Sequence, residues 1–179
     1  MDKKQARRAG LEARSALSFE IRKTLDKQIL QKLIPYIQQA DIIGCYISFQ
    51  DEADTYALMR YAYEQGKQIA VPSTHYHTLV FHLIDASTRF QKGYGGILEP
   101  CSPAMIDISQ IDLMLVPLSA FDHMCHRTGY GKGFYDTILS QCKYTVGIAY
   151  HVQEVEYIDV DPWDVTLDEI VTDQQNIKK

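Results

Sequence analysis

The amino-acid sequence predicts an α/β protein, with a single three-layer α/β/α domain built on a mainly parallel, Rossmann-like sheet. Three observations support this prediction. Short apolar segments alternate with amphipathic helical segments, which is the pattern of βαβ units. The chain has 179 residues, of which 46% are hydrophobic and 23% charged, enough for one core and ordinary for a globular protein. No repeat, low-complexity tract or linker divides it, so we expect one domain over residues 1–179.

The N-terminal segment predicts a helix over residues 3–16 with a basic side. At about 100° per residue, Lys3, Arg7 and Arg14 project within about 40° of one another, and alanines gather on another side. Two interpretations of the basic side remain open: a solvated helix face, or a surface that binds an anionic ligand. A second helix should begin after Ser18, a suitable N-cap, and Pro35 should kink or end it.

Apolar segments bounded by turn residues predict the strands. Strands are expected over residues 42–48, 67–71, 78–84, 111–117, 144–150 and 167–172, and further helices over residues 55–65 and 133–142. Asp54 should cap the first of these helices, Gly66 should end it, and Pro72 should close the strand that follows. Because ligands bind beyond the carboxyl ends of parallel strands, the loops after Ser48 and Pro117 are the expected sites of chemistry.

Composition argues against several classes of partner and location. The net charge of −5 argues against nucleic acid, because binding to a phosphate backbone needs a basic face. The N-terminal residues lack the apolar segment of a signal peptide, and the apolar runs are much shorter than a membrane span, so we expect no membrane association. The four widely spaced cysteines form no Cys-x-x-Cys pair and are expected to be reduced thiols, which indicates the cytoplasm.

The segment RTGYGKGFYD, from Arg127 to Asp136, is the most informative part of the sequence. Its alternating glycines let the backbone approach a ligand closely, and Arg127 and Lys132 add positive charge, as in a polyphosphate site. His126 and Gly133 exclude a Walker A motif, and the spacing is not that of the dinucleotide fingerprint. The alternative is a turn whose glycines only tighten a connection. The combination of Arg127, Lys132 and Asp136 favours phosphate binding.

Carboxylates in and beyond this segment are candidate magnesium ligands. Asp136 falls in the first turn of the expected helix, where a carboxylate either complements the helix dipole or holds Mg²⁺ together with substrate phosphates. Asp164 and Asp168 lie in an acidic stretch near the C-terminus. On spacing alone, these two residues are no better explained as metal ligands than as solvated loop acids.

Several segments resemble the 5-formyltetrahydrofolate cyclo-ligase family. The string R-x-G-Y-G-K-G-x-Y-D over residues 127–136 is the specific part, and it follows the Ala-Phe-Asp of residues 120–122 as in the family. Weaker matches occur in the family's order: Lys3-x-x-x-Arg7, residues 46–55, the Gly-Ile-Leu-Glu-Pro of residues 96–100, and residues 164–172. The resemblance extends from Lys3 to Thr172.

The resemblance implies a single α/β domain and a cytoplasmic ligase that depends on ATP and Mg²⁺. Its reaction would convert 5-formyltetrahydrofolate and ATP to 5,10-methenyltetrahydrofolate, ADP and phosphate, by phosphorylation of the formyl oxygen and attack by N10. Its partners would be these small molecules, with no nucleic acid or membrane, and we expect a monomer or a weak dimer. Two rivals remain: a phosphosugar isomerase or CoA-transferase-like enzyme, and a non-catalytic folate- or nucleotide-binding module.

The resemblance also implies roles for individual residues. The implied catalytic residues are Lys132, Arg127 and Tyr135, and the implied magnesium ligands are Asp136 and Asp164. The implied ATP-binding residues are Lys3, Lys4, Arg7, Arg127, Thr128, Gly129, Tyr130, Gly131, Lys132, Gly133, Phe134 and Tyr135. The residues implied to bind the folate are Ile47, Glu52, Tyr130, Gly131, Lys132, Gly133 and Phe134. A carboxylate such as Glu52 can accept two adjacent N–H donors of a pterin edge.

The sequence departs from the family's pattern at four positions. Leu118 and Cys125 stand where the family usually has glycine, Trp163 stands where histidine is frequent, and Phe134 replaces the first of two tyrosines. We expect Leu118 and Trp163 to narrow or reshape the folate pocket. Such changes affect substrate detail more than reaction type.

Overall fold

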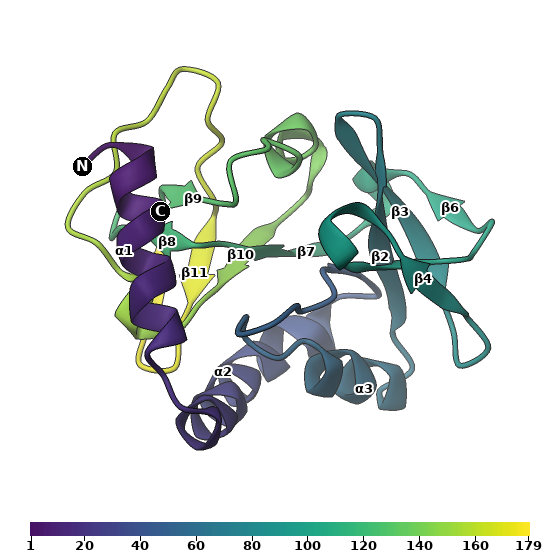
Figure 1. Cartoon of the computed structure of the whole chain (residues 1–179). Coiled ribbons are helices and arrows are strands. Elements are labelled where there is room, and N and C mark those ends of the chain that lie inside the picture. The colour runs from purple at the N-terminus through teal and green to yellow at the C-terminus, as the bar shows by residue number, and fades with distance from the viewer.

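An eight-stranded sheet forms the centre of the protein, whose computed structural model describes residues 1–179 (Figure 1). Its strands, in order across the sheet, are β12 (Asn176–Lys178), β11 (Glu169–Val171), β10 (Thr145–Ile148), β7 (Leu113–Pro117), β1 (Ile42–Cys45), β2 (Gln68–His75), β3 (Thr78–Ile84) and β6 (Met105–Ile106). The strands from β11 to β2 run parallel, and β12, β3 and β6 pair antiparallel with their neighbours. The predicted α/β fold with a mainly parallel sheet is confirmed.

Two α-helices, α2 (Phe19–Gln39) and α3 (Tyr56–Glu64), cover the lower face of the sheet in Figure 1. As predicted, the Ser18 side chain caps α2 by accepting a hydrogen bond from the Ile21 amide. Ile29, Leu33 and Ile37 of α2 are buried in one cluster with residues of β1, β7 and β10. Each such side chain contributes about 1.5–3 kcal/mol when fully buried, so this stripe anchors α2 on the sheet. None of the helices is long and apolar enough to cross a membrane.

Two prolines lie inside regular elements. We expected Pro35 to kink or end its helix and Pro72 to close its strand. α2 continues through Pro35 to Gln39, and the buried Ile37 holds its last turn against the core. β2 continues through Pro72, because its pairing with β1 ends at Ala70 and the rest of β2 pairs with β3 alone. A missing amide is tolerated at such an edge position, so Pro72 removes no hydrogen bond from the centre of the sheet.

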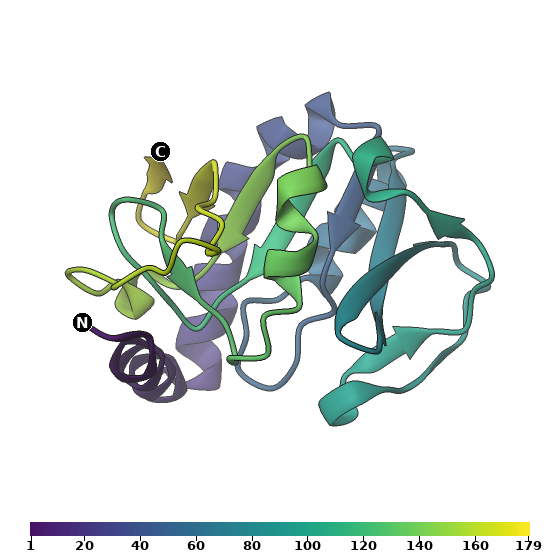
Figure 2. The same cartoon turned by 90° about the horizontal axis from the view of Figure 1, so that it is seen from above.

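The opposite face of the sheet is covered by two 3-10 helices, where we expected one helix over residues 133–142. These are η3 (Tyr135–Thr137) and η4 (Leu139–Gln141), the green segment that lies across the near face of the sheet in Figure 2. Ile138 and Leu139 are buried in one hydrophobic cluster with Met114 and Val116 of β7. The segment therefore packs as the third layer without forming an α-helix.

Local backbone preferences explain why this segment is not an α-helix. Gly131 and Gly133 have φ of +88° and +69°, so helical backbone cannot begin before Phe134. The Thr137 hydroxyl donates to the carbonyl of Phe134 at 2.7 Å, a local hydrogen bond of the kind that competes with helical pairing. Ile138 then leaves helical geometry with φ of −120°. The prediction of a helix with a dipole at its start was wrong.

Helix α1 (Lys3–Ser15) and a β-hairpin flank the sheet at opposite ends (Figures 1 and 2). The hairpin consists of β4 (Phe90–Lys92), η1 (Tyr94–Gly96) and β5 (Leu98–Pro100). The remaining short elements are β8 (Ala120–Phe121), β9 (Arg127–Thr128), η2 (Ile108–Gln110) and η5 (His151–Gln153). α1 packs on β8 and η5: Ala6 is fully buried with Ala120 and Ile158, and a Cβ added at Gly10 would lie 2.2 Å from the Ser119 carbonyl oxygen.

Candidate active site

A cavity of about 770 Å³ opens at the carboxyl ends of β1 and β7. Its wall is formed by α1, the loop after β1 (residues 46–55), the β4–β5 hairpin, and the glycine-rich loop between β9 and η3 (residues 129–134). The volume is typical of small-molecule sites, which span about 300–1,000 Å³. Both loops in which we expected chemistry line this cavity.

The glycine-rich loop lies directly against α1. The Arg7 Nε donates to the carbonyl of Gly129 at 2.5 Å. At Gly131, an added Cβ would lie 3.0 Å from Arg7 Nη2, and the residue has φ of +88°. Gly131 is therefore needed both for its backbone conformation and for the close approach of α1. The close approach at Gly131 is to Arg7 of the protein itself, and the approach of a ligand to these glycines stays a prediction.

The basic side of α1 faces the cavity. Lys3 and Arg7 both line it, whereas Lys4 is exposed to solvent and does not. Lys3 pairs with Asp161, with Nζ and Oδ2 2.7 Å apart, and also with Asp164. Burial opposes the charge of Lys3, but these two carboxylates together raise its pKa above its ordinary value. The solvated interpretation of the face formed by Lys3, Arg7 and Arg14 is therefore wrong, since none of these three side chains is fully exposed.

Glu52 lies half-buried in the loop after β1 and lines the cavity, as does the buried Ile47. The Oε2 of Glu52 accepts a hydrogen bond from the Phe49 amide at 2.9 Å. Burial raises the pKa of Glu52 above its ordinary value, and the Phe49 amide and the charge of Arg14 oppose that rise. Glu52 is therefore a partly buried carboxylate on the cavity wall, and not the solvated loop acid that its sequence context alone suggests.

Three buried side chains on the cavity wall carry polar atoms without a partner. They are Arg127 (Nε), Thr128 (Oγ1) and Tyr135 (hydroxyl). Buried polar groups are normally hydrogen-bonded, so three unpartnered atoms on one wall are unusual. Lys132, by contrast, is exposed at the cavity wall. The residues from Arg127 to Asp136 all line the cavity, so the structure brings together the segment that the sequence singled out.

Asp136 and Asp164 approach the cavity from two different segments. The Arg127 Nη2 donates to Asp136 Oδ1 at 2.8 Å, and Asp164 Oδ2 accepts from the Asp161 amide at 2.6 Å as well as pairing with Lys3. The second oxygen of each carboxylate accepts no hydrogen bond from the protein. No group of three or more His, Cys, Asp or Glu side chains could hold a metal ion by itself.

The β4–β5 hairpin is the part of the wall that sequence reasoning missed. Tyr94 and Leu98 line the cavity, and Glu99 Oε1 accepts from the amides of Thr74 at 2.9 Å and Tyr94 at 3.4 Å. These bonds hold the hairpin against β2. The Gly-Ile-Leu-Glu-Pro segment was a signal, but only the pairing of β4 with β5 determines where that segment lies.

Comparison with known proteins identifies the family. The family model of the 5-formyltetrahydrofolate cyclo-ligase family matches residues 1–173. The chain belongs to the 5-formyltetrahydrofolate cyclo-ligase family. This is a family of enzymes whose name places them among the ligases that act in folate and one-carbon metabolism.

Individual members of the cyclo-ligase family match most of the chain. It is 34% identical over 143 residues to the 5-formyltetrahydrofolate cyclo-ligase of Haemophilus influenzae, covering 75% of this chain and 76% of that protein. It is 29% identical over 170 residues to the Escherichia coli K12 enzyme of the same name, covering 89% and 93%. The structure of 5,10-methenyltetrahydrofolate synthetase from Aquifex aeolicus superposes with a TM-score of 0.88 at 27% identity, over 98% of this chain and 92% of that one. The synthetase from Mycoplasma pneumoniae gives a TM-score of 0.78 at 29% identity, over 97% and 99%.

Two departures from the cyclo-ligase pattern have a clear structural setting. Cys125 is buried with φ of +62°, in the left-handed region that favours glycine, which explains why glycine suits this position. Leu118 is buried on the cavity wall and packs on β10, where a Cβ added at Gly147 would lie 2.7 Å from its Cδ2. Leu118 therefore takes volume that a family glycine would leave free.

The other two departures lie at the opening of the cavity. Trp163 lines it with 71% of its surface exposed, so it can meet a ligand without closing the entrance. Phe134 packs edge-to-face against Tyr94, with ring centroids 5.3 Å apart. This contact joins the glycine-rich loop to the β4–β5 hairpin through an apolar pair that needs no hydroxyl.

Proposed function

We propose that this chain catalyses the ATP-dependent cyclisation of 5-formyltetrahydrofolate to 5,10-methenyltetrahydrofolate, with release of ADP and phosphate. One observation carries the proposal. A single cavity combines the half-buried carboxylate of Glu52 with a glycine-rich loop and a basic helix that suit phosphates. The relatives and neighbours named for this activity, which match most of the chain, support it.

The triphosphate would lie between α1 and the glycine-rich loop. Lys3 and Arg7 reach this space from α1, and Lys132 reaches it from the loop. Backbone amides of residues 129–134 would add uncharged donors, as in other loops where successive N–H groups bind an anion. Lys4 does not line the cavity, so we leave it out of the proposed phosphate contacts.

The pterin would lie at the end of the cavity formed by the loop after β1. Its edge presents adjacent N–H donors, and an ionised carboxylate can accept two of them at once. Glu52 is the residue in this loop with the required oxygen atoms on the cavity wall, and Ile47 offers an apolar surface beside it. The aromatic rings of Tyr130 and Phe134 suit a flat heterocycle on the other side.

The reaction balances without an oxidant or a reductant. The formyl oxygen attacks the γ-phosphorus of ATP, and the bond from that phosphorus to the β–γ bridging oxygen breaks, which releases ADP. N10 then attacks the activated formyl carbon and loses its proton. The new N10–carbon bond closes the five-membered ring. The carbon–oxygen bond then breaks and phosphate leaves, which gives the carbon–nitrogen double bond of the methenyl group. Catalysis of phosphoryl transfer depends mainly on positioning and charge stabilisation, which this cavity can supply.

Lys132, Arg127 and Tyr135 are the residues that we propose for catalysis. Each of these residues lines the cavity, and the Arg127 Nε and the Tyr135 hydroxyl have no protein partner. Burial raises the pKa of Tyr135 well above its ordinary value, with the nearby Cys45 and Glu52 adding to the rise, so its hydroxyl stays protonated as a donor. One preorganised donor to a developing negative charge is worth roughly 10²–10³ in rate.

Asp136 and Asp164 fit a magnesium ion that is held mainly by substrate phosphates. Magnesium prefers oxygen ligands and usually takes one or two carboxylates together with phosphates, and each of these carboxylates has one oxygen free of protein hydrogen bonds. When bound, the ion would offset negative charge on the phosphates. Arg127 and Lys3 hold these two carboxylates in place, so the residues that approach the phosphates also orient the proposed metal ligands.

The test is to mix the protein with 5-formyltetrahydrofolate and magnesium-ATP and to follow the near-ultraviolet absorbance of methenyltetrahydrofolate. We expect product that requires both substrates and Mg²⁺, with one ADP formed per product. Tyr135→Phe should slow turnover, whereas Arg8→Gln, at an exposed residue paired with Glu12 on α1, should not. Binding of both substrates without product would favour the non-catalytic module. Turnover of a CoA thioester or a sugar phosphate without ATP would favour the other rival.

We also propose that the chain acts as one domain over residues 1–179, as a monomer or a weak dimer, in the cytoplasm. One continuous eight-stranded sheet supports a single domain. The four cysteines, Cys45, Cys101, Cys125 and Cys142, form no disulfide in the structure, which agrees with a reducing location. Sedimentation of the purified chain would test the proposed state of association.

A further inference from the structure

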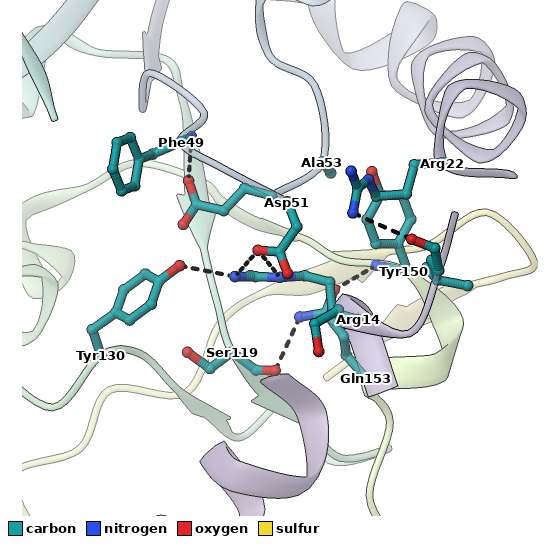
Figure 3. Close-up of polar contacts among 12 residues, drawn as sticks. Arg14, Arg22, Phe49, Asp51, Ala53, Ser119, Tyr130, Tyr150 and Gln153 are labelled. Carbon is teal, nitrogen blue, oxygen red and sulfur yellow. Dashed lines mark hydrogen bonds and ion pairs between the residues drawn. The ribbon is translucent and has the colours of Figure 1, made fainter. Parts of the chain in front are cut away.

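Arg14 is buried in the last turn of α1, with 2% of its surface exposed, and does not line the cavity. Its Nε and Nη2 lie 3.0 and 2.8 Å from Oδ1 of Asp51, and Nη2 also donates to the Tyr130 hydroxyl at 2.9 Å (Figure 3). A buried guanidinium is costly to desolvate unless it is paired and hydrogen-bonded. Burial opposes its charge, but Tyr130 and Asp51 together raise the pKa of Arg14 above its ordinary value. Arg14 is therefore a charged group fixed by two partners.

The two partners of Arg14 belong to different loops of the cavity wall. Asp51 precedes Glu52 in the loop after β1, where we place the folate. Tyr130 lies in the glycine-rich loop, and its ring is on the side of the cavity where we place the pterin. Among the side chains of α1, Lys3 bonds to the 161–164 loop and Arg7 to the glycine-rich loop. Only Arg14 bonds both to the loop after β1 and to the glycine-rich loop.

We infer that Arg14 is a positioning residue that fixes the Asp51–Glu52 turn and Tyr130 relative to each other, so that the folate side of the cavity is formed before substrate binds. The inference rests on the proposed function. Ordering a loop at the moment of binding costs affinity, and a loop that is already held avoids that cost. Arginine suits this role because its planar guanidinium is always charged and presents several N–H donors in a fixed geometry.

A simpler role for Arg14 would be to anchor α1 to the rest of the protein. The two roles predict different losses of ligand affinity when Arg14 is replaced. Lys3 and Arg7 are carried on α1, so a loose helix would weaken ATP binding at least as much as folate binding. Loss of a positioning residue for Glu52 would instead weaken folate binding more. α1 also keeps other contacts, through the buried Ala6 and the close approach of Gly10 to Ser119.

The experiment compares Arg14→Gln with Arg8→Gln, which removes an exposed arginine from the same helix. Calorimetry would measure the affinity of each folded variant for 5-formyltetrahydrofolate alone and for a non-hydrolysable ATP analogue alone. Because the Asp51–Glu52 turn and Tyr130 would then have to be ordered on binding, we expect roughly a tenfold to hundredfold loss of folate affinity in Arg14→Gln. The ATP analogue should lose no more than about twofold, and Arg8→Gln should change neither ligand by more than that.

Asp51→Asn provides the second variant if Arg14→Gln does not fold, because it keeps the bond between Arg14 and Tyr130. It should also weaken folate binding more than ATP binding, and the double variant should lose less than the sum of the two single losses. Unchanged folate affinity, or equal losses for both ligands, in the folded variants would overturn the inference while leaving the proposed function in place. A wild-type protein that binds no 5-formyltetrahydrofolate would overturn the proposed function and the inference with it.

Discussion

Replacing Glu52 by glutamine should weaken folate binding without lowering the stability of the protein. Glu52 is half-buried on the cavity wall, and burial raises its pKa because the charged form loses solvation. Glutamine keeps the shape and can still accept the Phe49 amide, which lies 2.9 Å from Glu52 Oε2. It offers the pterin a single neutral acceptor, where the carboxylate offers two charged oxygens.

Glu52→Gln changes folate affinity and the stability of the protein for different reasons. A hydrogen bond to a charged group is worth about 1.5–3 kcal/mol, so the KM for 5-formyltetrahydrofolate should rise roughly 10- to 150-fold. The raised pKa means that folded Glu52 holds its proton more tightly than the unfolded chain does. Its ionisation therefore lowers stability as pH rises through the raised pKa, and Glu52→Gln removes this loss. Folate affinity runs the other way, because it needs the ionised carboxylate and falls as pH drops below the raised pKa.

Steady-state kinetics for both substrates, from mildly acidic to neutral pH, would measure these effects together with a melting curve. The matched control is Glu64→Gln, at an exposed glutamate at the end of α3. We expect a raised KM for the folate alone, a weaker pH dependence of that KM, and a melting temperature that is unchanged or higher at neutral pH. A lower melting temperature with unchanged KM values, or equal rises for ATP and folate, would refute the assignment of Glu52 to the folate.

Three further substitutions test the phosphate side of the cavity. Lys132→Ala should lower kcat by roughly 10²–10³ while an ATP analogue binds nearly as well, as turnover and calorimetry would measure. Asp136→Ala should raise the Mg²⁺ concentration needed for half-maximal activity, with partial recovery at high Mg²⁺; an unchanged metal dependence would leave Asp136 as a partner of Arg127 only. Gly131→Ala should cost about 1–3 kcal/mol, because the residue has φ of +88° and meets Arg7, and should lower both the melting temperature and ATP affinity.

Much of the fold could be predicted because local signals and packing agree there. The Ser18 cap, the φ of +74° at Gly66 and the alternation of strands with helices all lie where the sequence suggested. Pro72 does not close β2, and α2 does not end at Pro35, because the cost of a proline depends on context. Pro35 is followed by the buried Ile37, and Pro72 lies where β2 has lost its partner β1. Neither fact can be read from the residues around a proline.

The candidate site also has a part that the sequence predicts and a part that depends on tertiary contacts. The segment from Arg127 to Asp136 carries its own signal, because its glycines, cations and carboxylate lie next to one another in the chain. The same periodicity that grouped Lys3, Arg7 and Arg14 left open whether they were solvated. Only tertiary contacts decide that question: Arg7 meets Gly129, and Arg14 is enclosed by residues from two distant loops. Amphipathic spacing gives the direction of a side chain, but it does not identify the partner.

The position of α1 determines when a newly made chain can form the contacts of its first helix. The partners of this first helix are made last: Arg7 bonds to a residue 122 positions later, and Lys3 to one 158 positions later. At a synthesis rate of about 5–20 residues per second, α1 waits several seconds or more after it emerges from the ribosome before those partners exist. Contacts between such distant residues also form late in folding, because the entropy of closing the intervening chain must be overcome first. A nascent chain that stops short of Asp161 thus lacks the partner that Lys3 needs, even after β1, β7 and β10 have been made.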